Sequence, residues 1–511
     1  MATNPIAERK AAEARAASHR WLVLVVVSIA QLMVVLDATV VNIALPSAQA
    51  ALGFDDSQRQ WIVTAYALAF GSLLLLGGRV GDLIGRKRIF MIGLVAFAAA
   101  SALGGAAPSF SVLVAARAIQ GVAGAMLAPA ALSTLVTTFS DPRERGKAFG
   151  VFGTVAVGGG AVGLILGGVL TQYLSWRWCM YVNVLFAVAA LFGAAIYMSE
   201  VKPPVRPRID IIGTLLAAIG LFAVVFGFSQ AETDGWGSGV TVVSLVVGVA
   251  FVLGFVLVER VVPHPLLPLR VVADRSRAMA FAAVGIAGLA MFGLFLFLTY
   301  YLQTVKGFSP VLSGLAFLPM IGCVMISSNT SNIVTLPRFG PRIIITIGMV
   351  LGALGLGYLS RLDVHSSYAG GVLPALLLMG LAMGMVMAPS MNTATAGVQP
   401  QDSGVAAALV STMQQIGGSI GTAVLSTIVA SVTTTYAKSH TGASAFAAAT
   451  HGYSAAFLTS ALIFAAGGVL AAVFFPSKAR LTAMRESVAA PHATPVTRLE
   501  TEMLDEVGAI G

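Results

Sequence analysis

The sequence predicts an all-α integral membrane protein, and three observations lead to this prediction. The chain of 511 residues is 57% hydrophobic and only 10% charged, whereas soluble domains are about a quarter charged. Its apolar runs reach the roughly 20 residues that a helix needs to cross a bilayer. The runs are also continuous, without the alternation of membrane β-strands, and in lipid only helices and closed barrels pair all their backbone groups. We therefore expect a bundle of membrane-spanning helices.

Fourteen apolar runs are long enough to be spans, and charged or Gly- and Pro-rich turns separate them. In chain order they cover 21–46, 58–80, 89–107, 112–137, 148–173, 178–199, 209–229, 240–259, 278–303, 312–336, 343–360, 372–396, 404–430 and 453–475. The first run has a secretory signal as its alternative. A signal core has about 7–15 apolar residues, whereas the run at 21–46 is longer and contains Asp37, so we interpret it as a permanent span.

The placement of lysine and arginine orients these spans, because cytoplasmic loops carry an excess of both. With the N-terminus in the cytoplasm, the inner segments hold 24 of the 30 basic residues, the outer segments hold five, and Arg117 lies within a span. This split predicts that both termini are cytoplasmic in a multi-pass protein of the inner (plasma) membrane. It also explains the net charge of +9 without nucleic acid as a partner.

An internal repeat divides the chain. The stretch from Gly85 to Gly93 has a counterpart from Gly340 to Gly348, 255 residues later, and both are basic turns that lead into a span. Paired halves around a midplane site are typical of transporters; the alternative is that basic cytoplasmic turns look alike by chance. The predicted organisation is a cytoplasmic tail (1–20), a six-helix half (21–199), an inserted two-helix hairpin (209–259), a second six-helix half (278–475) and a cytoplasmic tail (476–511).

Asp37 is the acidic residue that lies deepest in a span, 16 residues from its inner end and nine from its outer end. An intramembrane carboxylate costs roughly 2.5–3.5 kcal/mol on insertion scales and indicates a functional site. Burial disfavours its charged form, which suits reversible binding of a proton. Arg117 lies at a similar depth and can reach Asp37 directly or through Gln120, which shares its helix face. The alternatives are a structural hydrogen bond at Asp37 and a static ion pair with Arg117.

With these residues the sequence resembles the major facilitator superfamily, specifically its 14-span drug:proton antiporter branch of multidrug exporters, over nearly the whole chain. The stretch from Leu36 to Pro46 is similar to the span-1 signature of that branch. Motif B is matched by Arg117, Gln120 and Gly121. Motif A, in the loop between spans 2 and 3, is matched by Gly78, Asp82, Gly85, Arg86, Lys87 and Arg88. Antiporter motif C, on span 5, is matched by Gly150, Gly159, Gly163, Gly167 and Gly168, with Leu164 in place of its usual proline.

The resemblance implies roles for these motifs. It implies that Asp82, with Arg86, stabilises the outward-facing state and that this contact breaks on switching; the alternative is a plain basic loop. The glycines of span 5 allow a facing helix to approach closely, and such a sealed face is consistent with an exporter that blocks proton leak. Leu164 is expected to leave span 5 less kinked than a proline does.

Substrate contacts are harder to assign. Met379, Met383, Met387 and Met391 recur every four residues on one span, and methionine adapts to varied apolar shapes. Lipid contact or core filling is the common alternative for such a stripe. Polar and aromatic side chains in other spans are expected to orient the substrate. The candidates for substrate contact are Asn42, Tyr301, Gln303, Met383, Met387 and Gln414.

The expected function is proton-coupled export of lipophilic, neutral or monocationic drugs or antibiotics by a monomer that alternates its access, with the proton gradient as its energy source and no cofactor. The sequence has no phosphate-binding Gly-Lys-Ser/Thr loop and no clustered catalytic set, so we do not expect an enzyme. Two cysteines, Cys179 and Cys323, are too few for a metal site or a disulfide framework. The alternatives are a dedicated exporter of a self-made antibiotic, siderophore or lipid precursor, and a membrane sensor that transports nothing.

Overall fold

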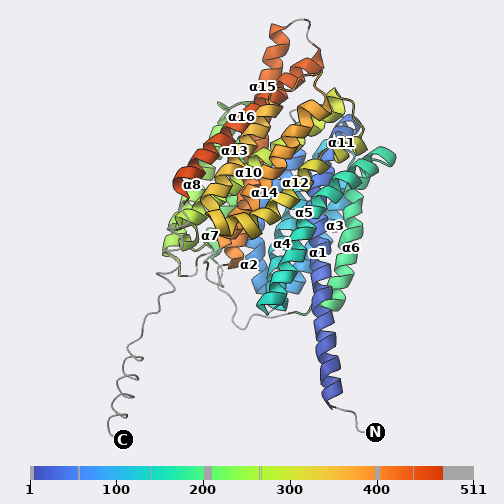
Figure 1. Cartoon of the computed structure of the whole chain (residues 1–511), viewed down its shortest axis with the longest axis vertical. Helices are drawn as coiled ribbons and strands as arrows, with labels where there is room; N and C mark the ends of the chain where they lie inside the picture. The colour runs from blue at the N-terminus through green and yellow to red at the C-terminus, as the bar shows by residue number, and fades with distance from the viewer. Residues whose placement is uncertain are drawn as a thin grey trace, which may run out of the picture.

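The computed structural model describes residues 5–55, 58–139, 141–200, 210–263, 265, 267–395, 398, 403–440, 442 and 444–475. All regular structure within these ranges is helical, as the sequence predicts, and the helices form an elongated bundle (Figure 1). The first six helices are α1 (Pro5–Leu52), α2 (Gln60–Ile84), α3 (Arg86–Gly105), α4 (Phe110–Thr138), α5 (Pro142–Tyr173) and α6 (Trp178–Tyr197). Next come α7 (Ile211–Asp234), α8 (Gly239–Val261) and the short α9 (Leu269–Ala273). The remaining elements are α10 (Arg275–Tyr300), η1 (Tyr301–Val305), α11 (Pro310–Ala316), α12 (Leu318–Thr330), η2 (Ser331–Thr335), α13 (Leu336–Leu359), η3 (Tyr368–Val372), α14 (Leu373–Thr395), α15 (Ser403–Ser439) and α16 (Ala445–Phe474).

Twelve helical segments in the described part of the chain are long and apolar enough to cross a membrane. One of them, Pro310–Leu359, is 50 residues long, which is about 75 Å at 1.5 Å per residue. α2 is a further helix of 25 residues, with an apolar stretch over Gln60–Leu74. The prediction of an all-helical membrane protein is confirmed at this level.

α1 differs in length from the predicted first span. It is one continuous helix of 48 residues from Pro5, so the described part of the predicted tail and the first span form a single helix. The N-terminal part of α1 projects below the bundle in Figure 1. A long helix explains why the polar start of the chain and the apolar run that follows share one element.

The long helices pack in two groups. In the first, α4 packs on α2 and α3, and α1 packs on α5 and α6. In the second, α10 packs on α15, and α13 packs on α14 and α16. α7 and α8 pack on each other, and α7 also contacts α2 of the first group and α15 of the second.

The two glycines that the internal repeat pairs share an unusual backbone conformation. Gly85 has a φ of 106° and Gly340 has a φ of 77°, and each lies at a sharp turn in the chain. Glycine adopts positive φ at little cost because it has no Cβ. The repeated turn therefore requires glycine at both positions, which agrees with a repeat and is unexpected for a chance likeness between two basic loops.

The two groups of helices touch at the end of the bundle that the charge count places outside. The hydroxyl of Tyr300 donates to Gln49 Oε1 at 2.5 Å, and Gln303 Nε2 donates to the carbonyl oxygen of Ile43 at 3.0 Å. The guanidinium of Arg59 lies 4.2 Å from the ring centroid of Tyr300, a cation–π distance. Arg59 counts as an outer loop residue by its position in the sequence, but its side chain is buried.

Gly121 tests the close packing of α4 on α2. A methyl group at this position would overlap the backbone of Tyr66 and Phe70, and backbone atoms cannot move aside as a side chain can. Gly121→Ala is therefore expected to lower the unfolding temperature in detergent, because overpacking costs about 1–3 kcal/mol. Gly153→Ala on α5 is the control, since no described residue lies near its added methyl group and alanine favours a helix over glycine. Equal unfolding temperatures for the two variants would contradict this packing.

Candidate functional site

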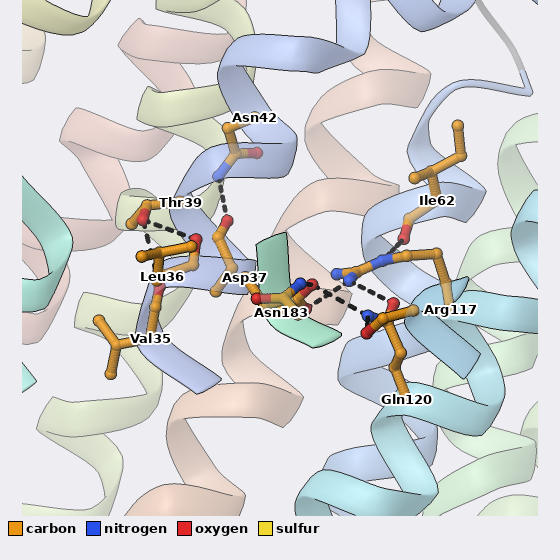
Figure 2. Close-up of polar contacts among 11 residues, drawn as sticks. Val35, Leu36, Asp37, Thr39, Asn42, Ile62, Arg117, Gln120 and Asn183 are labelled. Carbon is orange, nitrogen blue, oxygen red and sulfur yellow. Dashed lines mark hydrogen bonds and ion pairs between the residues drawn. The ribbon is translucent and has the colours of Figure 1, made fainter. Parts of the chain in front are cut away.

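The carboxylate of Asp37 lies in the middle of α1, is 0% exposed, and is surrounded by donors from two other helices (Figure 2). Arg117 Nη1, from α4, forms an ion pair with Asp37 Oδ2 at 2.5 Å. Gln120 Nε2, one turn further along α4, donates to Asp37 Oδ1 at 3.0 Å. Asn183 Nδ2, from α6, donates to the same oxygen at 2.7 Å. The structure thus brings Asp37 and Arg117 together both directly and through Gln120.

The guanidinium of Arg117 is held from several sides. Its Nη1 also donates to Gln120 Oε1 at 2.9 Å, and its Nε donates to the carbonyl oxygen of Ile62 on α2 at 3.1 Å. The guanidinium carbon lies 4.4 Å from the ring centroid of Tyr66. Gln120 Nε2 in turn donates to Ser101 Oγ of α3 at 2.8 Å. The cluster therefore joins α1, α2, α3, α4 and α6.

The hydrogen bonds determine what the cluster can do when a proton arrives. Every contact to the Asp37 carboxylate described above comes from an N–H donor. A protonated carboxyl group carries an O–H, which is itself a donor, so the bound proton needs an acceptor that the three N–H groups do not supply. The buried Oδ1 of Asn183 has no hydrogen-bond partner among the described residues. Rotation of this amide would present an acceptor to the protonated carboxyl group.

The glycines of motif C bring α5 against the turn of α1 that carries Asp37. An added methyl group at Gly163 would overlap Thr39, and one at Gly167 would lie 3.0 Å from the Cα of Val40. Gly168 instead faces α11, where an added methyl group would lie 2.7 Å from the carbonyl oxygen of Pro310. α5 is one continuous helix through Leu164, as the missing proline predicts.

The basic residues of motif A hold the C-terminal ends of neighbouring helices. Arg86 Nη1 donates to the carbonyl oxygen of Ser133 on α4 at 3.3 Å. Lys87 Nζ donates to two carbonyl oxygens at the end of α6, at 2.9 and 2.7 Å. Arg88 lies 3.8 Å from the carboxylate of Glu200. Cations at the C-terminal end of a helix interact favourably with its dipole, so Lys87 fixes α3 to α6.

Other predicted motif residues have simpler surroundings. Gly78 faces Pro129 of α4, where an added methyl group would make ordinary contact at 3.4 Å. Gly159 faces Leu32 of α1. Asp82 and Gly150 lie in α2 and α5, but their side-chain surroundings fall outside the described residues. The expected role of Asp82 therefore stays a prediction.

The predicted substrate contacts have different local surroundings. Tyr301 is buried, and its hydroxyl donates to the carbonyl oxygen of Asp363 at 2.7 Å. Met383 is buried in the core, and Asn42 Nδ2 donates to the carbonyl oxygen of Ala38 on its own helix. Gln303 belongs to the contact between the two helix groups, and Met387 and Gln414 are half-buried. Substrate contact by these residues stays a prediction.

Three members of the cluster were not assigned a role from the sequence. Asn183 is an amide six residues into an apolar run, close to the depth of Arg117, and that depth is a usable signal. Ser101 and Tyr66 give no such signal, because serine and tyrosine are common in membrane helices. Their part in the cluster depends on how α2, α3 and α4 pack.

The fold matches solved transporter structures. The crystal structure of an auto-inhibited peptide transporter of the POT family has a TM-score of 0.65, with 88% of this chain and 97% of that chain covered. The sequence identity is 16%, so the likeness concerns the fold alone.

Closer relatives are found by sequence. The chain is 48% identical to the puromycin resistance protein pur8 of Streptomyces alboniger, over 90% of this chain and 92% of the relative. It is 39% identical to the cephamycin export protein CmcT of Amycolatopsis lactamdurans, over 80% of this chain and 85% of the relative. The family pattern described as Major Facilitator Superfamily matches residues 27–422. The chain therefore belongs to the Major Facilitator Superfamily and is a multi-pass transporter of the cell membrane.

Proposed function

We propose that this chain is a proton-coupled secondary active exporter that moves lipophilic antibiotics or drugs out of the cell by alternating access. The observation that carries the proposal is the buried cluster in which the Asp37 carboxylate meets donors from α4 and α6. Relatives named for puromycin resistance and for cephamycin export support the direction of transport and the class of substrate. The proton gradient is the energy source, and the protein acts as a monomer without a cofactor.

The proposal includes fourteen spans with both termini in the cytoplasm. The 50-residue segment Pro310–Leu359 is divided by the turn at Gly340 and counts as two spans, and α2 adds one to the twelve segments. The excess of lysine and arginine on one side supports the orientation. α7 and α8 are then the inserted hairpin, between two six-span halves.

Protonation of Asp37 is the proposed coupling step. A proton from outside neutralises the carboxylate and removes the counter-ion of Arg117, and leaving a buried charge unpaired costs several kcal/mol. The cluster must rearrange: Asn183 turns its free Oδ1 toward the carboxyl group, and Arg117 moves toward its remaining partners, Ile62 and Gln120. Because these residues come from different helices, the rearrangement alters how the helices pack, releases the substrate outward and permits return to the inward-facing state.

A dedicated exporter of a self-made metabolite is the second candidate, with an antibiotic as its most direct example. The two relatives are each named for a single antibiotic rather than for multidrug export, and this observation favours a narrow range of substrates. The same proton coupling applies to both candidates. Export assays with structurally unrelated drugs separate them, because a dedicated exporter carries one chemical class.

Asp37→Asn tests the coupling step. The amide keeps the size of the side chain but cannot bind and release a proton, so we expect proton-driven export to be lost while the protein still inserts. Glu259→Gln is the matched control, since Glu259 is also buried but lies near the inner end of α8, where it accepts a hydrogen bond from Leu267 N. Export into inverted vesicles is measured with and without a proton gradient. Gradient-driven export by Asp37→Asn at the rate of the parent protein would remove Asp37 from the coupling role.

Substrate charge gives a second test. Among the buried polar residues, Asp37 is the carboxylate in the middle of a helix, and it is already paired with Arg117. A dication would leave at least one positive charge unpaired in the membrane interior, which costs several kcal/mol. A tenfold change in an equilibrium corresponds to about 1.4 kcal/mol. We therefore expect a monocationic dye to be exported at least about tenfold faster than a dication of similar shape in the same vesicles. Equal export rates for the monocation and the dication, in Glu259→Gln as well as in the parent protein, would contradict the argument that Asp37 is the only deep carboxylate.

A further inference from the structure

α2 and α15 meet along a seam between the two halves of the molecule. The helices are in contact, and an added methyl group at Gly71 of α2 would lie 3.1 Å from Cβ of Gln415 on α15. α2 runs from the predicted outer side inward, and α15 runs in the opposite direction. Moving from this contact toward lower residue numbers on α2, or by the same number of residues toward higher numbers on α15, therefore reaches the same depth. Both directions lead toward the outer side.

The helical repeat decides which residues face each other along the seam. Residues three, four, seven and eleven positions apart share one face of an α-helix. Seven positions from the contact, Thr64 of α2 is level with Thr422 of α15, and eleven positions away, Gln60 is level with Ser426. Ser419, four positions along α15, lies on the same face at the depth of Ala67. The outer half of the seam is thus lined by polar side chains from both halves.

The polar atoms of this seam are buried without partners. Gln60, Thr64, Ser419 and Ser426 are 0%, 0%, 1% and 3% exposed. Both amide atoms of Gln60 and the hydroxyl oxygens of the other three have no hydrogen-bond partner among the described residues. Thr422 differs, because its hydroxyl donates to the carbonyl oxygen of Gly418 at 2.7 Å. A buried polar atom without a partner is destabilising. The four unpaired side chains therefore destabilise the closed seam, whereas the bonded hydroxyl of Thr422 does not.

We propose that the seam of Gln60, Thr64, Ser419 and Ser426 opens to the outside during the transport cycle and that its unpaired polar atoms set the balance between the closed and open states. When the outer ends of α2 and α15 separate, these side chains bind water and the polar groups of the departing substrate. In the closed state, these side chains make none of those hydrogen bonds. This inference rests on the proposed alternating access. It assigns the balance between the states that are closed and open to the outside to four side chains.

The contacts beside the seam act in the opposite direction. Arg59 precedes Gln60, and its guanidinium lies over the ring of Tyr300 from the other half. Tyr300 also donates to Gln49, and Gln303 to Ile43. The cation–π contact and the two hydrogen bonds hold the outer end closed, while the unpaired polar atoms of the seam favour its opening. A transporter needs such a near balance, because a strongly favoured state would stop the cycle.

A pair of identical substitutions tests the proposal. Thr64→Val removes an unpaired hydroxyl, whereas Thr422→Val removes a bonded hydroxyl at the same depth on the opposite helix. The reporter is Ala67→Cys, a buried position on the seam, in a chain whose native cysteines, Cys179 and Cys323, are replaced by alanine. Its labelling by a membrane-impermeant maleimide, added from outside under conditions where opening is faster than labelling, measures the open fraction.

We expect the reporter to be labelled from outside and Thr64→Val to slow its labelling by about tenfold. Thr422→Val should leave the rate within about twofold of the reporter chain. Ser426→Ala removes a second unpaired hydroxyl and is expected to act like Thr64→Val, which covers the case in which one variant fails to fold. An unlabelled reporter in a chain that still exports would overturn the proposal, and so would equal rates for the two valine variants. Normal labelling in a chain that exports nothing would instead contradict the proposed function and leave the seam intact.

Discussion

A charge inside an apolar helix bundle must be surrounded by partners, and this requirement at Asp37 organises the first group of helices. An unpaired buried carboxylate costs several kcal/mol, and here Arg117, Gln120 and Asn183 supply its hydrogen bonds. Arg117 carries the same requirement and meets it at Ile62 and Tyr66. The positions of α1, α2, α4 and α6 therefore depend on one another through a single neutral pair. A change in the charge of Asp37 is felt by all four helices at once.

Beyond this cluster, the described helices show two features: close backbone packing and buried polar atoms without hydrogen-bond partners. Within the first group of helices, glycines let backbones touch, as where Gly121 of α4 meets α2 and Gly167 of α5 meets α1, and Lys87 holds the end of α6. Where the two groups meet, along α2 and α15, the buried amide of Gln60 has no hydrogen-bond partner among the described residues. Well-packed interiors move as units, whereas an under-satisfied junction is the place where two packings differ little in free energy. Tightly packed groups of helices that meet at such a junction fit the proposed alternating access.

Much of this arrangement could be predicted from the sequence, because the membrane imposes strong rules. Helical spans follow from the apolar runs, and the pairing of Asp37 with Arg117 follows from their depth and charge, since no other residue of opposite charge lies deep within a span. Asn183 could have been added by the same depth argument. Tyr66, Ser101 and the burial of Arg59 could not, because each depends on which face of a helix meets which neighbour. The continuity of α1 through residue 20 is not evident from the sequence, because a membrane span and its polar extension have different compositions but the same backbone.

The most direct test of the central claim is infrared difference spectroscopy of the purified protein between alkaline and acidic pH. The claim is that Asp37 binds a proton and that the Asn183 amide changes its hydrogen bond in response. We expect a band of a protonated, buried carboxyl group to appear on acidification together with a change in a side-chain amide band, and we expect both signals to be absent in Asp37→Asn. Asn183→Leu should retain the carboxyl band and lose the amide change. An unaltered carboxyl band in Asp37→Asn would contradict the central claim.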